Sequence, residues 1–361
     1  MRTENDLRDA FRTLAAEAPD TESVLDHRSG NGAKRGRPRL VAPITAAAAV
    51  IAIAVASVVL TAGGGGSGTG PAPAATGNAL PEYYVATVLS GRTTIRDTRT
   101  GAVLATVRLP VGYGVRFAAG AGNDRSFVLA LESAGVIRLF RLRFDPATRQ
   151  TSLNLLPIPA VSDFSGLAMS PAGTQIAAVL LDGSKHSELR IYSLTGRLVR
   201  RWQGPGQICF PSGIVPCLSW ADNGTLAFNW VYRGLFVLHT GAASGPLSAV
   251  ARLVVPSSRV WSQALSQDGS KIAAVVRHPD RPGSTSEFFE FEEFSVASGK
   301  LISRPAGKRH FGLFVIWSNP SGSSLIVRVR EGAPSPVGVL AGGRFVPLRG
   351  LPDMGVAAIA F

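Results

Sequence analysis

The feature that most constrains the fold is a segment that recurs five times along the chain. In each copy an apolar run ends in a tight turn, and a second apolar run follows the turn. The runs are short and rich in β-branched and aromatic residues, so each copy predicts β-strands joined by turns. The turn glycines are separated by 51, 51, 45 and 53 residues and are Gly122, Gly173, Gly224, Gly269 and Gly322.

The period of the repeat predicts a β-propeller, because four short strands in about 40–50 residues are typical of one propeller blade. Residues 83–109 lack a leading inner strand, whereas 354–361 (MGVAAIAF) resemble an inner strand without a continuation. Joined, the two ends make one composite blade and leave no open sheet edge. We therefore expect an all-β fold with six blades, closed by the C-terminal strand. A seventh blade would have to fit within 143–165, which is short for one.

Two of the turns carry a recognisable motif, SPAGTQIAAV at 170–179 and SQDGSKIAAV at 266–275. These turns resemble the Ser-Pro-Asp-Gly repeats of TolB-like and WD-like propellers, and the resemblance covers roughly residues 83–361. Ala172 stands at the usual aspartate position in one turn, whereas Asp268 keeps the aspartate in the other. We therefore expect this aspartate to hold its own turn rather than a ligand.

Upstream of the repeats, residues 40–62 form an uncharged apolar block of 23 residues. A helix needs about 20 apolar residues to cross a bilayer. Four basic residues within 34–39 precede the block, and the next basic residue is Arg92. The positive-inside rule therefore predicts an uncleaved, single-pass transmembrane helix with a cytoplasmic N-terminus. A cleaved signal peptide is the alternative, although 39 residues precede the apolar block and no small-x-small cleavage site ends it.

These patterns divide the chain into four parts: a cytoplasmic segment (1–39), a transmembrane helix (40–62), a flexible Gly/Pro linker (63–80) and an extracytoplasmic propeller domain (81–361). The Gly/Pro stretch 63–78 has a root-mean-square reach of about 20–24 Å, so the propeller would stay close to the cell membrane. The layout resembles that of single-pass actinobacterial membrane proteins, some of which are similar to transmembrane anti-sigma regulators.

The N-terminal 28 residues predict a short amphipathic helix on the cytoplasmic side. Leu7, Phe11 and Leu14 recur at helical spacing, and Pro19 ends the pattern. An isolated helix of this length is marginal in water, so its apolar face needs a surface. Seven acidic residues against four basic ones disfavour the anionic inner leaflet. We expect these three side chains to bind a cytoplasmic protein; a tail with incidental helicity is the alternative.

The net charge of +13 does not indicate a nucleic-acid partner. Residues 1–62 contain eight basic and seven acidic residues, so about +12 belongs to the exported part. The basic residues are scattered singly through strand-like segments instead of forming one stripe. This distribution favours a general attraction to anionic lipid or cell-wall polymer.

The chain contains two cysteines, Cys209 and Cys217, and the predicted topology places both outside the cytoplasm. An even pair in an oxidising compartment predicts a disulfide. A zinc site is disfavoured, because no further His or Cys lies nearby to complete the ligand set.

No pattern in the sequence predicts catalysis, a cofactor or a metal centre. The five histidines lack ligand-like spacing, and a catalytic triad assembled across blades remains open. In the acidic run 287–294, Glu290 and Glu292 share one strand face, opposite Phe289 and Phe291. Paired carboxylates could bind Ca²⁺ or a cationic ligand, but we expect a solvated outer face backed by buried rings.

The function that these observations favour is a membrane-anchored binding or interaction module without catalytic activity. Trp220 and Trp317 end inner-strand motifs, so they either line the central channel or pack between blades. Two alternatives remain open. One is a transmembrane anti-sigma-like regulator that holds a cytoplasmic partner through 1–28, and the other is an exported hydrolase or lyase with its site at the channel.

Overall fold

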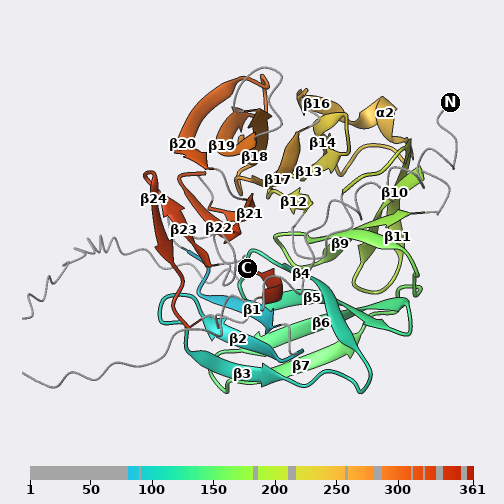
Figure 1. Ribbon diagram of the computed structural model, residues 1–361. Helices are drawn as coiled ribbons and strands as arrows, with labels where there is room; N and C mark the ends of the chain where they lie inside the picture. The colour runs from blue at the N-terminus through green and yellow to red at the C-terminus, as the bar shows by residue number, and fades with distance from the viewer. Residues whose placement is uncertain are drawn as a thin grey trace, which may run out of the picture. The chain divides into compact units, whose positions relative to one another are not determined.

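The computed structural model shows a ring of β-sheets (Figure 1). It describes residues 80–88, 91–181, 186–209, 217–256, 259–279, 287–309, 312–319, 322–330, 336–350 and 356–361. The predicted cytoplasmic segment, the apolar block 40–62 and nearly all of the linker lie outside these residues. Within the described part of the chain, no helix has the length and apolar character needed to cross a membrane.

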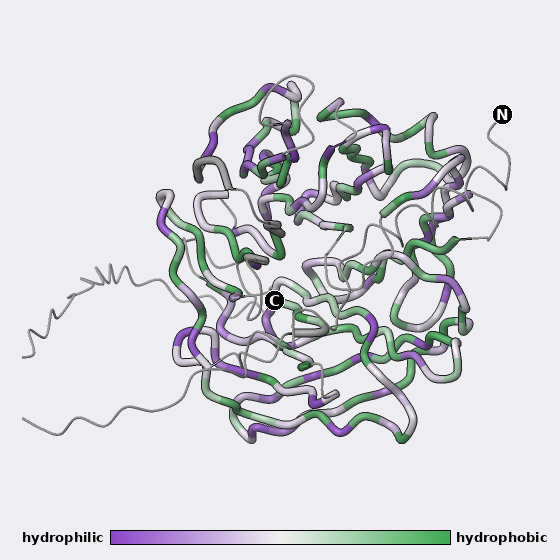
Figure 2. The backbone as a smooth tube through the Cα atoms, viewed as in Figure 1, coloured by the Kyte–Doolittle hydropathy of each residue, from purple (hydrophilic) through white to green (hydrophobic). Residues whose placement is uncertain are grey.

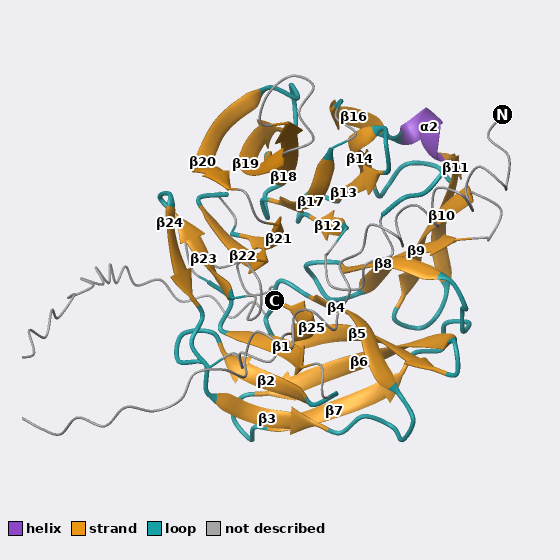
Figure 3. Cartoon of the chain, viewed as in Figure 1, coloured by secondary structure: helices purple, strands orange, loops and turns teal. Residues whose placement is uncertain are grey.

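Six sheets form six blades around a central axis, as the repeat predicted (Figure 3). Blade 1 has the strand order β25-β1-β2-β3, and blades 2 to 6 are β4–β7, β8–β11, β12-β13-β14-β16, β17–β20 and β21–β24. Blade 3 gains a fifth, parallel strand, β15 (Gly245–Pro246), beside β11. The described residues contain one helix, the four-residue α2 (Leu247–Val250).

Each blade runs from an innermost strand at the axis to an outermost strand at the rim. The innermost strands are β25 (Val356–Ala360), β4 (Gly114–Gly120), β8 (Phe164–Met169), β12 (Leu218–Trp220), β17 (Val260–Leu265) and β21 (Gly312–Ser318). The second strands are β1 (Tyr83–Val88), β5 (Ser126–Ser133), β9 (Gln175–Leu181), β13 (Thr225–Trp230), β18 (Lys271–Pro279) and β22 (Ser324–Arg330). The third strands are β2 (Thr93–Asp97), β6 (Val136–Asp145), β10 (His186–Ser193), β14 (Gly234–His239), β19 (Glu287–Ser295) and β23 (Val337–Ala341). The fourth strands, which are outermost in every blade except blade 3, are β3 (Val103–Val107), β7 (Gln150–Leu155), β11 (Leu198–Pro205), β16 (Arg252–Val255), β20 (Leu301–Arg309) and β24 (Arg344–Pro347).

The two ends of the propeller region close the ring, which confirms the composite blade. Strand β25 pairs antiparallel with β1, and the register places Ala360 opposite Val85 and Ile359 opposite Ala86. The rings of Tyr84 and Phe361 stack with centroids 5.2 Å apart. The span 143–165 is not a seventh blade, because β7 within it is the outermost strand of blade 2.

The core lies between the blades, and both faces of the inner strands contribute to it. In β25, Ala360 joins the cluster shared with blade 2, whereas Ile359 and, just after the strand, Phe361 join the cluster shared with blade 6. Because each blade is covered on both faces, strands such as β9 are apolar along almost their whole length. Hydrophobic stretches accordingly occur in every blade (Figure 2).

This packing contradicts the expectation that Glu290 and Glu292 lie on a solvated face. Their exposed fractions are 8% and 5%. Their cross-strand partners Val276 and Ala274 lie on the same face of blade 5, and these partners belong to the cluster shared with blade 4. Phe291, on the other face, is buried towards blade 6. The third strand of a blade is therefore covered on both faces, which period-two patterning does not reveal.

The turns after the innermost strands of blades 3 and 5 confirm that the aspartate of the motif holds its own turn. The Oδ1 atom of Asp268 accepts hydrogen bonds from the Ser270 N–H at 2.9 Å and from the Ser266 hydroxyl at 2.6 Å. In the blade 3 turn, where Ala172 replaces the aspartate, the Ser170 hydroxyl accepts from the backbone N–H of Gln175 at 3.0 Å. The aspartate position thus serves turn geometry.

Candidate binding site in the central channel

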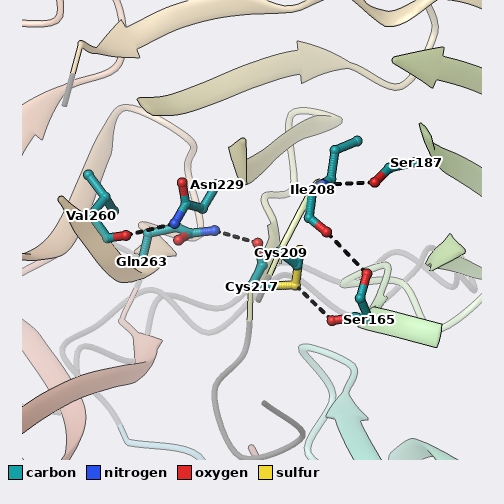
Figure 4. Close-up of a disulfide and its surroundings, with 8 residues drawn as sticks. All are labelled: Ser165, Ser187, Ile208, Cys209, Cys217, Asn229, Val260 and Gln263. Atoms are coloured by element: carbon teal, nitrogen blue, oxygen red, sulfur yellow. Dashed lines mark hydrogen bonds between the residues drawn. A yellow bond between two sulfur atoms is a disulfide. The ribbon is translucent and has the colours of Figure 1, made fainter. Parts of the chain in front are cut away.

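The inner strands of blades 3, 4 and 5 are joined near a disulfide between Cys209 and Cys217 (Figure 4). This bond confirms the predicted pairing. The N–H of Cys209 donates to the carbonyl of Asn229 at 2.9 Å, and the amide of Gln263 in blade 5 donates to the carbonyl of Cys217. The hydroxyl of Ser165 in blade 3 donates a hydrogen bond to the carbonyl of Ile208, the residue before Cys209, at 3.1 Å. The disulfide segment therefore links three blades beside the axis.

At the axis, all six blades line one cavity of about 110 Å³. The lining comes from the innermost strands and the turns that follow them. Among the described lining residues none carries a charged side chain, and they are residues 118–122, 167–169, 171, 218–220, 265, 267, 316–318 and 359–361.

Two tryptophans give this cavity its most distinctive surface. Trp220 of blade 4 and Trp317 of blade 6 both line it, and both rings are half-buried. Each ring also packs against an apolar cluster between blades. Both placements that the sequence left open are therefore correct, because each tryptophan lines the cavity and also packs against a cluster between blades.

Hydrogen bonds between blades hold the lining strands in place. The backbone N–H of Leu265 donates to the Ser219 hydroxyl at 2.8 Å, which joins blades 5 and 4. The N–H of Asp222 donates to the carbonyl of Gln267 at 2.7 Å. The N–H of Gly122 donates to the carbonyl of Pro171 at 3.0 Å and joins blades 2 and 3. The cavity walls are thus built on paired backbone.

Gln267 narrows the cavity at the turn side. A Cβ atom on Gly122 would lie 3.0 Å from the Gln267 side-chain nitrogen, so the amide of blade 5 reaches to blade 2 on the opposite side of the ring. At Gly120, a Cβ would collide with the backbone carbonyl of Phe361. Small residues on β4 therefore allow the other blades to approach the axis closely.

Three of the turns next to the cavity carry an aspartate, and two of these aspartates lie near a basic residue, Arg125 or Lys271. Asp124, Asp222 and Asp268 each follow an innermost strand by a few residues. Burial, followed by the charge of Asp268, raises the pKa of Asp222. Burial also raises the pKa of Asp268, but hydrogen bonds from Ser266 and Ser270 outweigh it and hold that pKa below its usual value. These carboxylates favour a cationic group at this end of the channel.

One predicted site is untested, and one residue of the cavity was not predicted. Leu7, Phe11 and Leu14 lie outside the described residues, so the cytoplasmic site stays a prediction. Gln267 was not singled out by sequence reasoning, because nothing in its local pattern shows that it crosses the ring.

Sequence comparison finds no matching family model and no matching curated protein. Among solved structures, a chain in the nidogen/laminin complex has a TM-score of 0.51 at 12% identity and covers 77% of this chain and 97% of that one. A putative TolB from Agrobacterium tumefaciens has a TM-score of 0.48 at 14% identity and covers 73% and 87%. TolB from Acinetobacter baumannii has a TM-score of 0.49 at 16% identity and covers 76% and 66%. At these identities the likeness is one of fold alone.

Proposed function

We propose that this chain is a membrane-anchored propeller that binds a partner outside the cytoplasm and does not catalyse a reaction. The observation that carries the proposal is the channel cavity. Three consecutive blades bring the half-buried rings of Trp220 and Trp317 and the amide of Gln267 to it, beside aspartate-bearing turns. Indole faces and carboxylates both attract cations. The proposed ligand is therefore a cationic group, such as a Lys or Arg side chain of a partner protein.

Similar folds give this proposal support by analogy. A chain of this fold occurs in the nidogen/laminin complex, which is a complex between proteins. Function resides in sites and not in folds, so the analogy raises the expectation of an interaction module without naming its partner.

The membrane anchor in this proposal rests on the apolar block 40–62 and on the basic residues before it. Residues 63–78 of the linker have a root-mean-square reach of about 20–24 Å, so the propeller would stay near its anchor. A partner in the cell envelope, near the membrane, suits this geometry.

A photo-crosslinking experiment tests the channel site. A photoreactive amino acid is placed in the full-length chain at Gln267, or at Val346 on outermost strand β24 as a control with 60% exposure. Irradiation of host cells should give a discrete adduct from position 267 only. The adduct should disappear when Trp317→Ala is added. Equal labelling from both positions, or an adduct that ignores Trp317→Ala, would contradict a channel site.

The regulator alternative is favoured by one feature, the apolar spacing of Leu7, Phe11 and Leu14. If these residues bind a cytoplasmic protein, residues 1–39 used as bait should capture it. The triple change of these residues to Asp should abolish capture, whereas Thr21→Asp, outside the apolar stripe, should not. Capture that is the same with all three baits would refute the predicted face.

A further inference from the structure

A cluster of one histidine and two glutamates lies on blade 5, away from the channel cavity. The Nε2 atom of His278 is 3.3 Å from Glu292 Oε1 and 3.8 Å from Glu290 Oε2. One nitrogen and two carboxylate oxygens thus lie within 4.8 Å of one another. Such a set is that of a metal centre with mixed N and O ligands.

Strand register brings these residues together. In the β18–β19 pair, Ala274 is opposite Glu292, Val276 is opposite Glu290, and His278 is opposite Phe288. Alternate residues share a face, so the imidazole lies diagonally across from Glu290 on the same side of the blade. The His278 ring also stacks on Phe288, with centroids 5.3 Å apart, which restricts its orientation.

The charges in this cluster balance only if the imidazole is protonated or a cation is bound. Both glutamates are buried. The guanidinium of Arg304 on β20 forms ion pairs with both, at 3.1 Å from Glu292 and 3.4 Å from Glu290. With a neutral imidazole, the two carboxylates and the one guanidinium leave one negative charge, which either a proton on His278 or a bound cation would offset. Among the described residues, the buried His278 Nε2 atom makes no hydrogen bond. The cluster therefore has a carboxylate charge that the guanidinium alone does not neutralise, and a nitrogen ligand atom without a hydrogen bond.

We propose that His278, Glu290 and Glu292 bind a divalent transition-metal ion of the zinc type. Zinc lies about 2.0–2.2 Å from such ligands, which places tetrahedral ligand atoms roughly 3.3 Å apart. The His278–Glu292 distance has this value, and the His278–Glu290 distance is about half an ångström longer. An imidazole ligand favours zinc over Ca²⁺ and Mg²⁺, which prefer oxygen.

Arg304 is the competitor of the metal ion at this site. Its side chain is 52% exposed and extends from the outermost strand, so it can leave the carboxylates without disturbing the core. Three protein ligands leave a fourth position for water or an external ligand. The ion would tie β18 to β19 at the face that packs on blade 4.

Zinc titration of the full-length protein, prepared without a polyhistidine tag, tests the site. Calorimetry should show one zinc ion per chain, and Co²⁺ should give the visible absorption of a tetrahedral site. His278→Ala and Glu292→Gln should each weaken zinc binding at least tenfold and abolish the Co²⁺ bands. His239→Ala, a histidine outside the cluster, is the matched control and should bind as the unaltered chain does. Arg304→Ala should bind several-fold more tightly, because it removes the competing cation.

Each result decides the proposal. Circular dichroism checks that the variants fold. If Glu292→Gln does not fold, His278→Ala still tests the site, since the histidine side chain is 31% exposed and its loss disturbs the core less. No zinc binding by the unaltered chain would overturn the site, as would equal affinity in the unaltered chain and His278→Ala. Weaker binding by Arg304→Ala would count against zinc at these two carboxylates, because an ion held there has to displace the guanidinium.

Discussion

Single polar side chains hold the propeller turns, and Asp97 shows how. Its Oδ1 atom accepts from the Thr100 N–H at 2.7 Å and from the Thr100 hydroxyl at 2.8 Å. The backbone hydrogen bond from Thr100 is the main cause that lowers the pKa of Asp97 below its ordinary value of 3.8, against an opposing effect of burial. The ionised carboxylate therefore stabilises the folded state more than the protonated acid does.

This shift predicts a pH dependence. The unfolded chain takes up the proton at a higher pH than the folded chain does, so the contribution of Asp97 is complete above about pH 3.8 and is lost as the pH falls through the lower folded value. Asp97→Asn keeps an acceptor oxygen but does not titrate. Its melting temperature should lie below that of the unaltered chain at about pH 6, and the gap should shrink below about pH 4. A gap that stays constant with pH would contradict the assignment.

Gly166 illustrates how closely the disulfide approaches β8. A Cβ atom there would lie 2.5 Å from Cys217 Sγ and 3.1 Å from Cys209 Sγ. Gly166→Ala should therefore lower the free energy of unfolding by about 1–3 kcal/mol, as overpacking does. Gly114→Ala is the matched control, because a Cβ at that inner-strand position meets nothing within 4 Å. Equal urea midpoints for the two variants would show that the disulfide segment yields at little cost.

At the scale of elements, the disulfide stabilises the segment that leads into β12. Closing a loop from Cys209 to Cys217 removes unfolded-state entropy worth about 2–3 kcal/mol. Cys209→Ser with Cys217→Ser should therefore lower the melting temperature by roughly 3–5 °C. A reductant should lower the melting temperature of the unaltered chain by a similar amount and leave that of the double variant unchanged. A reductant effect on the double variant would mean that the loss has another cause.

Strand β25 is the element on which ring closure depends. Deleting 354–361 removes the inner strand of blade 1 and uncovers apolar clusters on both of its faces. Each large side chain such as Ile359 or Phe361 contributes about 1.5–3 kcal/mol in burial, against about 5–15 kcal/mol for a typical domain. The truncated chain should aggregate or become sensitive to protease. Ile359→Ala is a milder test and should cost about 2–5 kcal/mol. An unchanged melting transition after the deletion would be inconsistent with closure by this strand.

At the scale of the whole molecule, membrane topology stays a prediction from 40–62 and the basic residues before it. A reporter that is active only outside the cytoplasm should work when fused after Phe361 and stay silent when fused before Met1. The protein should also sediment with membranes after an alkaline wash. Recovery of a shortened, soluble chain from the medium would favour the cleaved signal peptide instead.

The sequence by itself determined the blade count, the composite blade and the cysteine pair. These features are local or periodic. Gly269 identifies its turn from the neighbouring residues alone, and residues 354–361 show the alternation of an inner strand even before their partner strand is known. Four short strands in about 45–53 residues are the spacing of a propeller blade, and residues 354–361 supply the inner strand that 83–109 lack, so the architecture follows from the repeat together with this complementarity.

Only the tertiary structure decided which side chains meet. Glu290 and Glu292 alternate along their strand like solvated residues, yet blade 4 covers that face, and the β18–β19 register brings His278 to them. Gln267 reaches Gly122 because their blades lie on opposite sides of one narrow axis. Contacts of this kind depend on register and on packing between blades, and neither leaves a local pattern in the sequence, because any apolar neighbour satisfies the same strand periodicity.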